Sequence, residues 1–208
     1  MLLCTMNESE IKNEIQKEFN FLCDKINYRR ERFVNQIKRE KKAAFPICTK
    51  TDITTINNNK GYIVFIAECS THCITSHATA YFIMRNHIGK QVLVEVAMDN
   101  KTIGSIAIYS AHFFERYAER LGLDVKGVSA IEHFITHYLR GTYHKVDGKI
   151  FEPYPFGVGL GTYNTDNTFM YINTFVSNEL LFDNQQEIVD IIKNKYNASR
   201  DITTIIKY

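Results

Sequence analysis

Apolar residues recur at three- and four-residue steps from about Ser9 to Ala44, which is the pattern of one face of a long amphipathic helix. Ser9 is a candidate N-cap for this helix, and Pro46 lies just beyond its far end. The apolar face consists of Ile11, Ile15, Phe19, Leu22, Ile26, Phe33 and Ile37. Because such a face is unfavourable in water, the helix needs a surface to pack against.

A polar segment at residues 47–60, with three consecutive asparagines, follows this helix and is expected to be a linker. Beyond it, segments rich in β-branched and aromatic residues predict strands, and further amphipathic segments predict helices. The dipeptide Asp147-Gly148 is typical of a tight hairpin turn. The expected strands lie at residues 62–68, 74–85, 91–97, 102–109, 142–146, 149–152, 156–163 and 168–176, and the expected helices at 111–121, 129–140 and 184–196.

This order of elements predicts an α+β protein with a mainly antiparallel β-sheet, two short amphipathic helices and a long N-terminal helix. We expect three parts along the chain. They are a basic amphipathic helical arm at residues 1–46, a polar linker at 47–60 and an α+β domain at 61–208.

The composition is that of a globular protein. Of the 208 residues, 45% are hydrophobic and 23% charged, so a sizeable core can form. No apolar run approaches the roughly 20 residues that a membrane span needs, so we expect a soluble protein with no membrane partner. The five cysteines are scattered and odd in number, which favours a reducing compartment and a cytoplasmic location.

The charge is unevenly distributed. The formal net charge is +2, yet residues 25–42 alone carry eight basic and two acidic side chains. One interpretation is a basic arm that contacts RNA, another nucleic acid or an acidic protein. The other is a solvated helix face whose apolar side packs on its own domain or on a second copy, forming a homodimer through the N-terminal helix.

The segment SAHFFERYAERLG contains the first group of candidate catalytic residues. At 100° per residue, His112, Arg116 and Arg120 fall within about 80° along one edge of the apolar face. Arginines four residues apart repel each other, which indicates either neighbouring acids or an anionic ligand. The local acids Glu115 and Glu119 make a surface salt-bridge lattice the alternative.

The next expected helix places His133, His137 and Arg140 side by side. If the two helices pack together, their imidazole and guanidinium groups face one cleft. These are the groups that metal-independent RNA cleavage requires, with no cofactor. One group would take the proton of the 2′-hydroxyl, another would protonate the leaving oxygen, and the arginines would stabilise the phosphorane. Metal binding by the two histidines is an alternative, less favoured because EHFITH lacks the glutamate that follows the first histidine in metalloproteases. A further alternative is that the two histidines lie on a polar helix face and have no catalytic or metal-binding function.

The run HFFERYAER, the second short helix, the turn-separated strands and the final strand ending in Thr174-Phe175-Val176-Ser177 together resemble the barnase, EndoU and RelE-like nuclease superfamily, especially its phage and mobile-element branches. The resemblance covers about residues 105–195. It implies a toxin-like endoribonuclease with His112 as acid/base, Arg116 and Arg120 as phosphate ligands and Thr174 as a hydroxyl donor to the phosphate. A partner protein that inhibits the activity is a further expectation. The rival hypothesis is a non-enzymatic interaction module that dimerises or binds a partner through the N-terminal helix.

Two other patterns leave alternatives open. Cys69, His72, Cys73 and His77 are chemically competent for zinc, although their spacing differs from that of zinc fingers and structural thiols are the favoured interpretation. The alternating glycines at positions 157, 159 and 161 indicate a close backbone approach, either to a ligand or to packed aromatic side chains.

Overall fold

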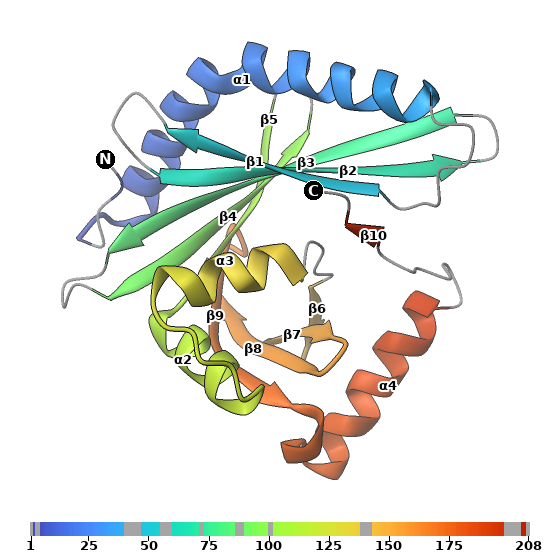
Figure 1. Ribbon diagram of the computed structural model, residues 1–208. Coiled ribbons are helices and arrows are strands. Elements are labelled where there is room, and N and C mark those ends of the chain that lie inside the picture. The colour runs from blue at the N-terminus through green and yellow to red at the C-terminus, as the bar shows by residue number, and fades with distance from the viewer. Residues whose placement is uncertain are drawn as a thin grey trace. The chain divides into compact units, whose positions relative to one another are not determined.

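The computed structural model describes residues 2, 5–39, 47–54, 60–70, 73–85, 90–99, 102–137, 143–197 and 205–206. It confirms an α+β protein with a mainly antiparallel sheet, a long N-terminal helix and two short helices (Figure 1). None of the helices in these ranges is long and apolar enough to cross a membrane. In chain order the elements are α1 (Glu8–Arg39), β1 (Ile47–Thr54), β2 (Lys60–Ser70), β3 (Cys73–Arg85), β4 (Gln91–Asp99), β5 (Thr102–Tyr109), α2 (Ala111–Arg120), α3 (Val128–His137), β6 (His144–Val146), β7 (Lys149–Tyr154), β8 (Gly157–Tyr163), β9 (Phe169–Ser177), the 3-10 helix η1 (Asn178–Leu180), α4 (Asp183–Asn197) and β10 (Ile205–Ile206).

The chain forms two compact units. The first takes in residues 1–87, 95–105 and 202–208, and the second residues 88–94 and 106–201. Strands β4 and β5 contribute residues to both units. These units differ from the expected division at residue 60, because α1 belongs to the same unit as β1, β2 and β3.

In the first unit the strand order is β10-β1-β2-β3-β4-β5, with β2 antiparallel to both β1 and β3. Helix α1 lies along β2 and β3 (Figure 1). Its apolar face is buried there, and the Phe33 ring lies 6.2 Å from the Phe65 ring of β2. The sheet of the first unit is thus the surface against which the apolar face of α1 was expected to pack.

Two local expectations for this unit are corrected. Helix α1 begins at Glu8 with Asn7 as its cap, since the Asn7 side chain accepts from the Glu10 amide at 3.0 Å and the Glu10 carboxylate accepts from the Asn7 amide at 2.8 Å. Ser9 lies inside the helix. The segment expected to be a polar linker contains β1, which pairs with β2 from Ile47 opposite Ala67 to Thr54 opposite Lys60.

In the second unit the strand order is β4-β5-β9-β8-β7-β6. Strand β5 runs parallel to β9, and the pairs β9–β8, β8–β7 and β7–β6 are antiparallel. Between β6 and β7, Asp147 and Gly148 both have positive φ, +49° and +76°, so the predicted tight hairpin turn is confirmed.

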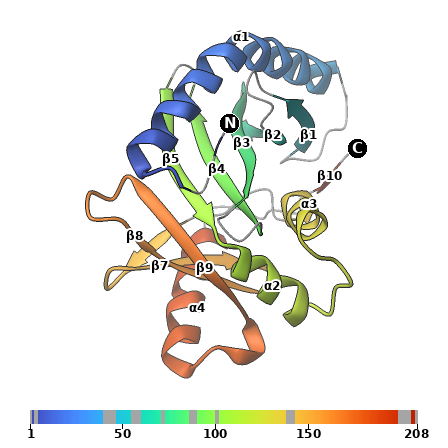
Figure 2. The ribbon, with the colours of Figure 1, turned by 90° about the vertical axis from the view of Figure 1, so that its left-hand side faces the viewer.

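Helices cover both faces of the strands β7, β8 and β9. Phe175 of β9 packs against Phe113 and Tyr117 of α2, and Figure 2 shows α2 beside β9. Val176, the residue after Phe175, packs in the cluster that contains Val189 of α4. Since adjacent strand residues point to opposite faces, α2 and α4 lie on opposite sides of β9.

The core on the α2 side is aromatic, and most of its ring pairs meet edge to face, the favoured geometry. Its members are Tyr109, Phe113, Phe114, Tyr117, Phe134, Tyr154 and Phe175. The β8 glycines make room for it. A Cβ on Gly157 would lie 2.5 Å from Cζ of Phe175, and one on Gly159 would lie 3.4 Å from Cε2 of Phe113. Of the two interpretations of the glycine run, close approach to packed aromatic side chains is confirmed.

Candidate functional site

Helix α2 carries three of the predicted site residues and is fixed at both ends. The Ser110 hydroxyl caps it by accepting from the Phe113 amide at 3.1 Å and donates to the Asn173 carbonyl of β9 at 2.8 Å. At the other end, the amide of Leu123 donates to the carbonyl of Ala118, and Gly122 has a φ of +62°. This is a Schellman motif, in which glycine takes the left-handed conformation without strain.

The predicted charged edge of α2 exists, but its members are engaged by the protein itself. His112 Nδ1 lies 3.8 Å from Glu115 Oε2, and Arg116 Nη1 lies 2.5 Å from Glu119 Oε2. Arg120 donates to the backbone carbonyl of Phe175. The salt-bridge lattice that the sequence offered as an alternative is therefore present on this helix.

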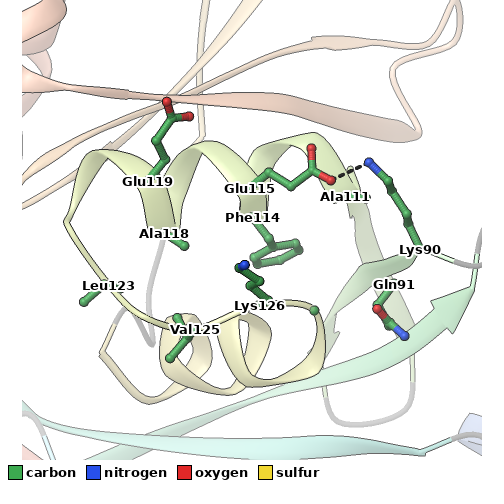
Figure 3. A pocket seen from close by; sticks show the side chains of 11 residues that line it. Lys90, Gln91, Ala111, Phe114, Glu115, Ala118, Glu119, Leu123, Val125 and Lys126 are labelled. Atoms are coloured by element: carbon green, nitrogen blue, oxygen red, sulfur yellow. Dashed lines mark hydrogen bonds and ion pairs between the residues drawn. The ribbon is translucent and has the colours of Figure 1, made fainter.

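A cavity of about 490 Å³ lies on the other side of α2 (Figure 3). None of the predicted site residues that the structure describes lines it, which holds for His112, Arg116, Arg120, His133, His137 and Thr174. Glu115 stands at its edge and pairs with Lys90 at 2.5 Å, a hydrogen bond that holds the pKa of the Glu115 carboxyl below its usual value. The lining residues are Lys90, Gln91, Ala111, Phe114, Glu115, Ala118, Glu119, Leu123, Val125, Lys126 and Gly127.

Thr174 lies on the face of β9 opposite to α2. The register of β8 and β9 shifts after the pair Leu160–Thr174, and Gly161 pairs with Ile172, so Asn173 is an extra residue in β9. Beyond this bulge Phe175 faces α2, whereas Val176 faces α4. Thr174 is two residues before Val176 and shares its face. The strand therefore separates the Thr174 hydroxyl from the histidine and arginines of α2.

The two predicted histidines of α3 do come together. Their rings stack with centroids 4.0 Å apart and an interplanar angle of 16°. His133 Nδ1 lies 2.7 Å from the Tyr117 hydroxyl, and His137 Nδ1 lies 2.8 Å from the His133 carbonyl oxygen. Burial lowers the pKa of His133, and the charge of His137 lowers it further. Arg140, expected beside this pair, lies outside the described residues.

Among the side chains that the structure describes, no group of three or more His, Cys, Asp or Glu could hold a metal ion, and the side chains of Cys69 and Cys73 lie outside that set. Cys73 begins β3 and pairs with Ser70, while His77 pairs with Ile66 further along the hairpin. Four residues of extended strand separate their backbones by about 13 Å. His72 lies outside the described residues.

The outer side of α1 carries exposed residues that were not among the candidate site residues. Phe21 and Tyr28 are exposed there, at 40% and 61%, and do not belong to the buried apolar face. Lys25 Nζ lies 4.6 Å from the centroid of the Phe21 ring, and the Arg32 guanidinium 5.8 Å from that of Tyr28. The signal was present in the sequence, since both aromatic residues fall outside the three- and four-residue steps of the apolar face.

Phe21, Lys25, Tyr28, Arg32 and Arg39 form a row that we call the α1 stripe. On a helix they fall within about 60° of one another and extend over about 27 Å. All five are exposed. The segment 21–39 carries six cationic and two acidic residues, and in the part of the chain that the structure describes none of the six cations forms an ion pair with a carboxylate. The stripe is therefore a cationic and aromatic surface that forms no ion pair with the acidic side chains of the described residues.

Comparisons with protein-family models, with curated proteins and with solved structures find no match to this chain. They neither support nor refute the resemblance to the nuclease superfamily. The function proposed for the chain accordingly depends on its own residues.

Proposed function

We propose that this chain is a nucleic-acid-binding protein that holds a single strand along the α1 stripe. The observation that carries the proposal is the exposed row of alternating aromatic and cationic side chains on α1, whose opposite face is buried on the protein's own sheet. Binding to single strands generally combines cations that follow the phosphates with aromatic rings on which bases stack.

The charge of the stripe favours an anionic polymer. Lysines and arginines that lack intramolecular carboxylate partners gain most from phosphates, because phosphate binding releases the counterions of the nucleic acid. A length of about 27 Å corresponds to roughly eight nucleotides at about 3.4 Å per nucleotide of a stacked strand.

The aromatic residues favour a nucleic acid over an acidic protein, and a single strand over a duplex. An exposed ring such as Tyr28 offers a π-face to any base, but the base must be unstacked from its neighbours to use it. Dimerisation through the apolar face of α1 has less support, since residues such as Ile15, Phe19 and Phe33 are buried within the first unit.

RNA cleavage, the activity that the sequence resemblance implies, is not included in this proposal. Arg116 and Arg120 are engaged by Glu119 and the Phe175 carbonyl, and Thr174 lies on the other face of β9. The binding experiment nevertheless tests for it, because gel analysis of the labelled RNA after incubation with a chelator reveals metal-independent cleavage.

The test is fluorescence anisotropy with a labelled single-stranded RNA of about 12 nucleotides and the DNA of the same sequence. The stripe variant Lys25→Gln/Arg32→Gln/Arg39→Gln should bind at least about tenfold more weakly than wild type. A matched control that removes three exposed lysines away from the stripe, Lys12→Gln/Lys60→Gln/Lys149→Gln, should bind within about twofold of wild type. Equal affinity of the two triple variants would refute the proposal.

A second pair of variants tests stacking separately from charge. Base stacking on an aromatic side chain contributes about 1–3 kcal/mol, so Tyr28→Leu should weaken binding by about 5- to 150-fold. Tyr28→Phe keeps the ring and should bind as wild type does. Circular dichroism before each titration verifies that the variants are folded. If Leu and Phe at position 28 bind equally well, the ring does not contact a base.

A further inference from the structure

The stacked histidines of α3 have a geometry that goes beyond the proposed function. His133 and His137 lie one helical turn apart, and neither is among the residues that bind the strand in that proposal. Their rings are nearly parallel at a centroid distance of 4.0 Å. Two imidazoles side by side on one turn of a helix concentrate nitrogen lone pairs on a small surface.

The hydrogen bonds indicate which ring nitrogens are available. A carbonyl oxygen can only accept, so the Nδ1 of His137, 2.8 Å from the His133 carbonyl, carries the proton of the neutral ring. The Nε2 of His137 then holds the lone pair. His133 Nδ1 lies 2.7 Å from the Tyr117 hydroxyl, whose oxygen can accept a hydrogen bond from Nδ1–H in the same way and leave Nε2 with its lone pair.

This is the arrangement found around histidines that bind metals. Such a histidine almost always donates its other ring N–H to an oxygen atom, which fixes the tautomer and the ring orientation. Here one ring has a backbone carbonyl and the other a phenol in that position.

We infer that His133 and His137 together bind a divalent transition-metal ion such as Zn²⁺, Ni²⁺ or Cu²⁺ through their Nε2 atoms, with water completing the coordination. Imidazole suits these ions, whereas Mg²⁺ prefers oxygen ligands. Because Zn–N bonds are about 2.0–2.1 Å long, the two rings must tilt from parallel so that both nitrogens reach one ion. Among the described residues no third His, Cys, Asp or Glu joins the pair, so the site is an open one.

This role differs from the proton transfer that the sequence suggested for the same residues. It is also independent of the α1 stripe, so loss of metal binding and loss of nucleic-acid binding would be separate results. Tyr117 is a positioning residue in this inference, because its hydroxyl orients the His133 ring without touching the ion.

The experiment is calorimetric titration of the 208-residue chain, without a histidine tag, with ZnCl₂, NiCl₂, CuCl₂ and MgCl₂. Affinity should rise from Ni²⁺ to Cu²⁺ and fall again at Zn²⁺, with no Mg²⁺ binding. His137→Ala and His133→Ala should each weaken Ni²⁺ binding by more than about tenfold, and Tyr117→Phe by about tenfold or more. His112→Ala, which removes an exposed histidine outside the pair, is the matched control and should bind as wild type does.

Nuclear magnetic resonance locates the ion and separates this site from the chain's cysteines. Sub-stoichiometric Cu²⁺ should broaden the amide signals of α3 first, and the broadening should disappear in His137→Ala. The exposed position of His137 keeps this variant informative if His133→Ala fails to fold. Undiminished Ni²⁺ affinity in His137→Ala, or broadening that begins elsewhere, would overturn the inference.

Discussion

Replacing Tyr109 by Phe tests the buried polar contacts of the second unit. The Glu152 side chain is almost completely buried, at 1% exposure, and both of its carboxylate oxygens lie 3.1 Å from the Tyr109 hydroxyl. A hydroxyl has one proton, so this contact counts as one shared hydrogen bond rather than two. The Tyr143 hydroxyl lies 2.9 Å from that of Tyr109 and is left to donate to it.

The expected loss in the free energy of unfolding follows from these hydrogen bonds. Tyr109→Phe leaves the buried Glu152 carboxyl group without one hydrogen-bond partner, and a buried polar group that loses its partner costs about 1–3 kcal/mol. For a protein of this size, 1 kcal/mol corresponds to about 2–4 °C in Tm, so the variant should melt about 2–12 °C lower. Tyr143→Phe removes the hydrogen bond between the Tyr143 and Tyr109 hydroxyls, and the loss of a hydrogen bond between neutral groups should cost about 0.5–1.5 kcal/mol.

Equilibrium urea unfolding, followed by circular dichroism and tyrosine fluorescence, measures both variants against wild type. Binding of the oligonucleotide serves as a control and should be unchanged in both, since neither residue belongs to α1. If Tyr109→Phe costs less than 0.5 kcal/mol, or less than Tyr143→Phe, then the phenol does not hold the buried carboxylate as described.

Two further predictions use the same assay. Gly157→Ala should destabilise the protein by about 1–3 kcal/mol, because the new Cβ would lie 2.3 Å from the Val176 carbonyl oxygen; a variant as stable as wild type would mean that β8 and β9 can separate there without cost. Burial and the charge of His137 lower the pKa of folded His133 below 6.5, so its contribution to stability is present above pH 6.5 and is lost as the pH falls from 6.5 through the folded pKa. The loss of stability between pH 7.5 and 5.5 should therefore be smaller in His133→Gln than in wild type, and an equal loss would contradict this.

Much of the fold follows from periodicity. Helix α2 was expected at residues 111–121 and spans Ala111–Arg120, and α4 was expected at 184–196 and spans Asp183–Asn197. Both segments have apolar residues at helical spacing, which local sequence records directly. Strand β1 was missed for the opposite reason. Only Ile47, Cys48 and Ile53 are buried in it, so its stability comes from pairing with β2 and not from a pattern of its own.

The candidate site was less predictable than the fold. A helical wheel correctly places Arg116 and Arg120 on one edge of α2, but it cannot show whether an anion, a carboxylate or a backbone carbonyl reaches them. In the structure, Arg116 pairs with Glu119 and Arg120 donates to the Phe175 carbonyl. The face of Thr174 depends on the bulge at Asn173, which arises from pairing with β8 and leaves no mark in the sequence of β9 alone.

The salt dependence of oligonucleotide binding tests the role of the α1 stripe most directly. For a single strand, the slope of log K against log salt concentration is about −0.7 for each phosphate contacted. If Lys25, Arg32 and Arg39 each contact a phosphate, their replacement by glutamine should make the slope shallower by about 2, with the slope of the Lys12/Lys60/Lys149 control unchanged. A slope that is the same in wild type and in the stripe variant would show that phosphates do not bind along α1.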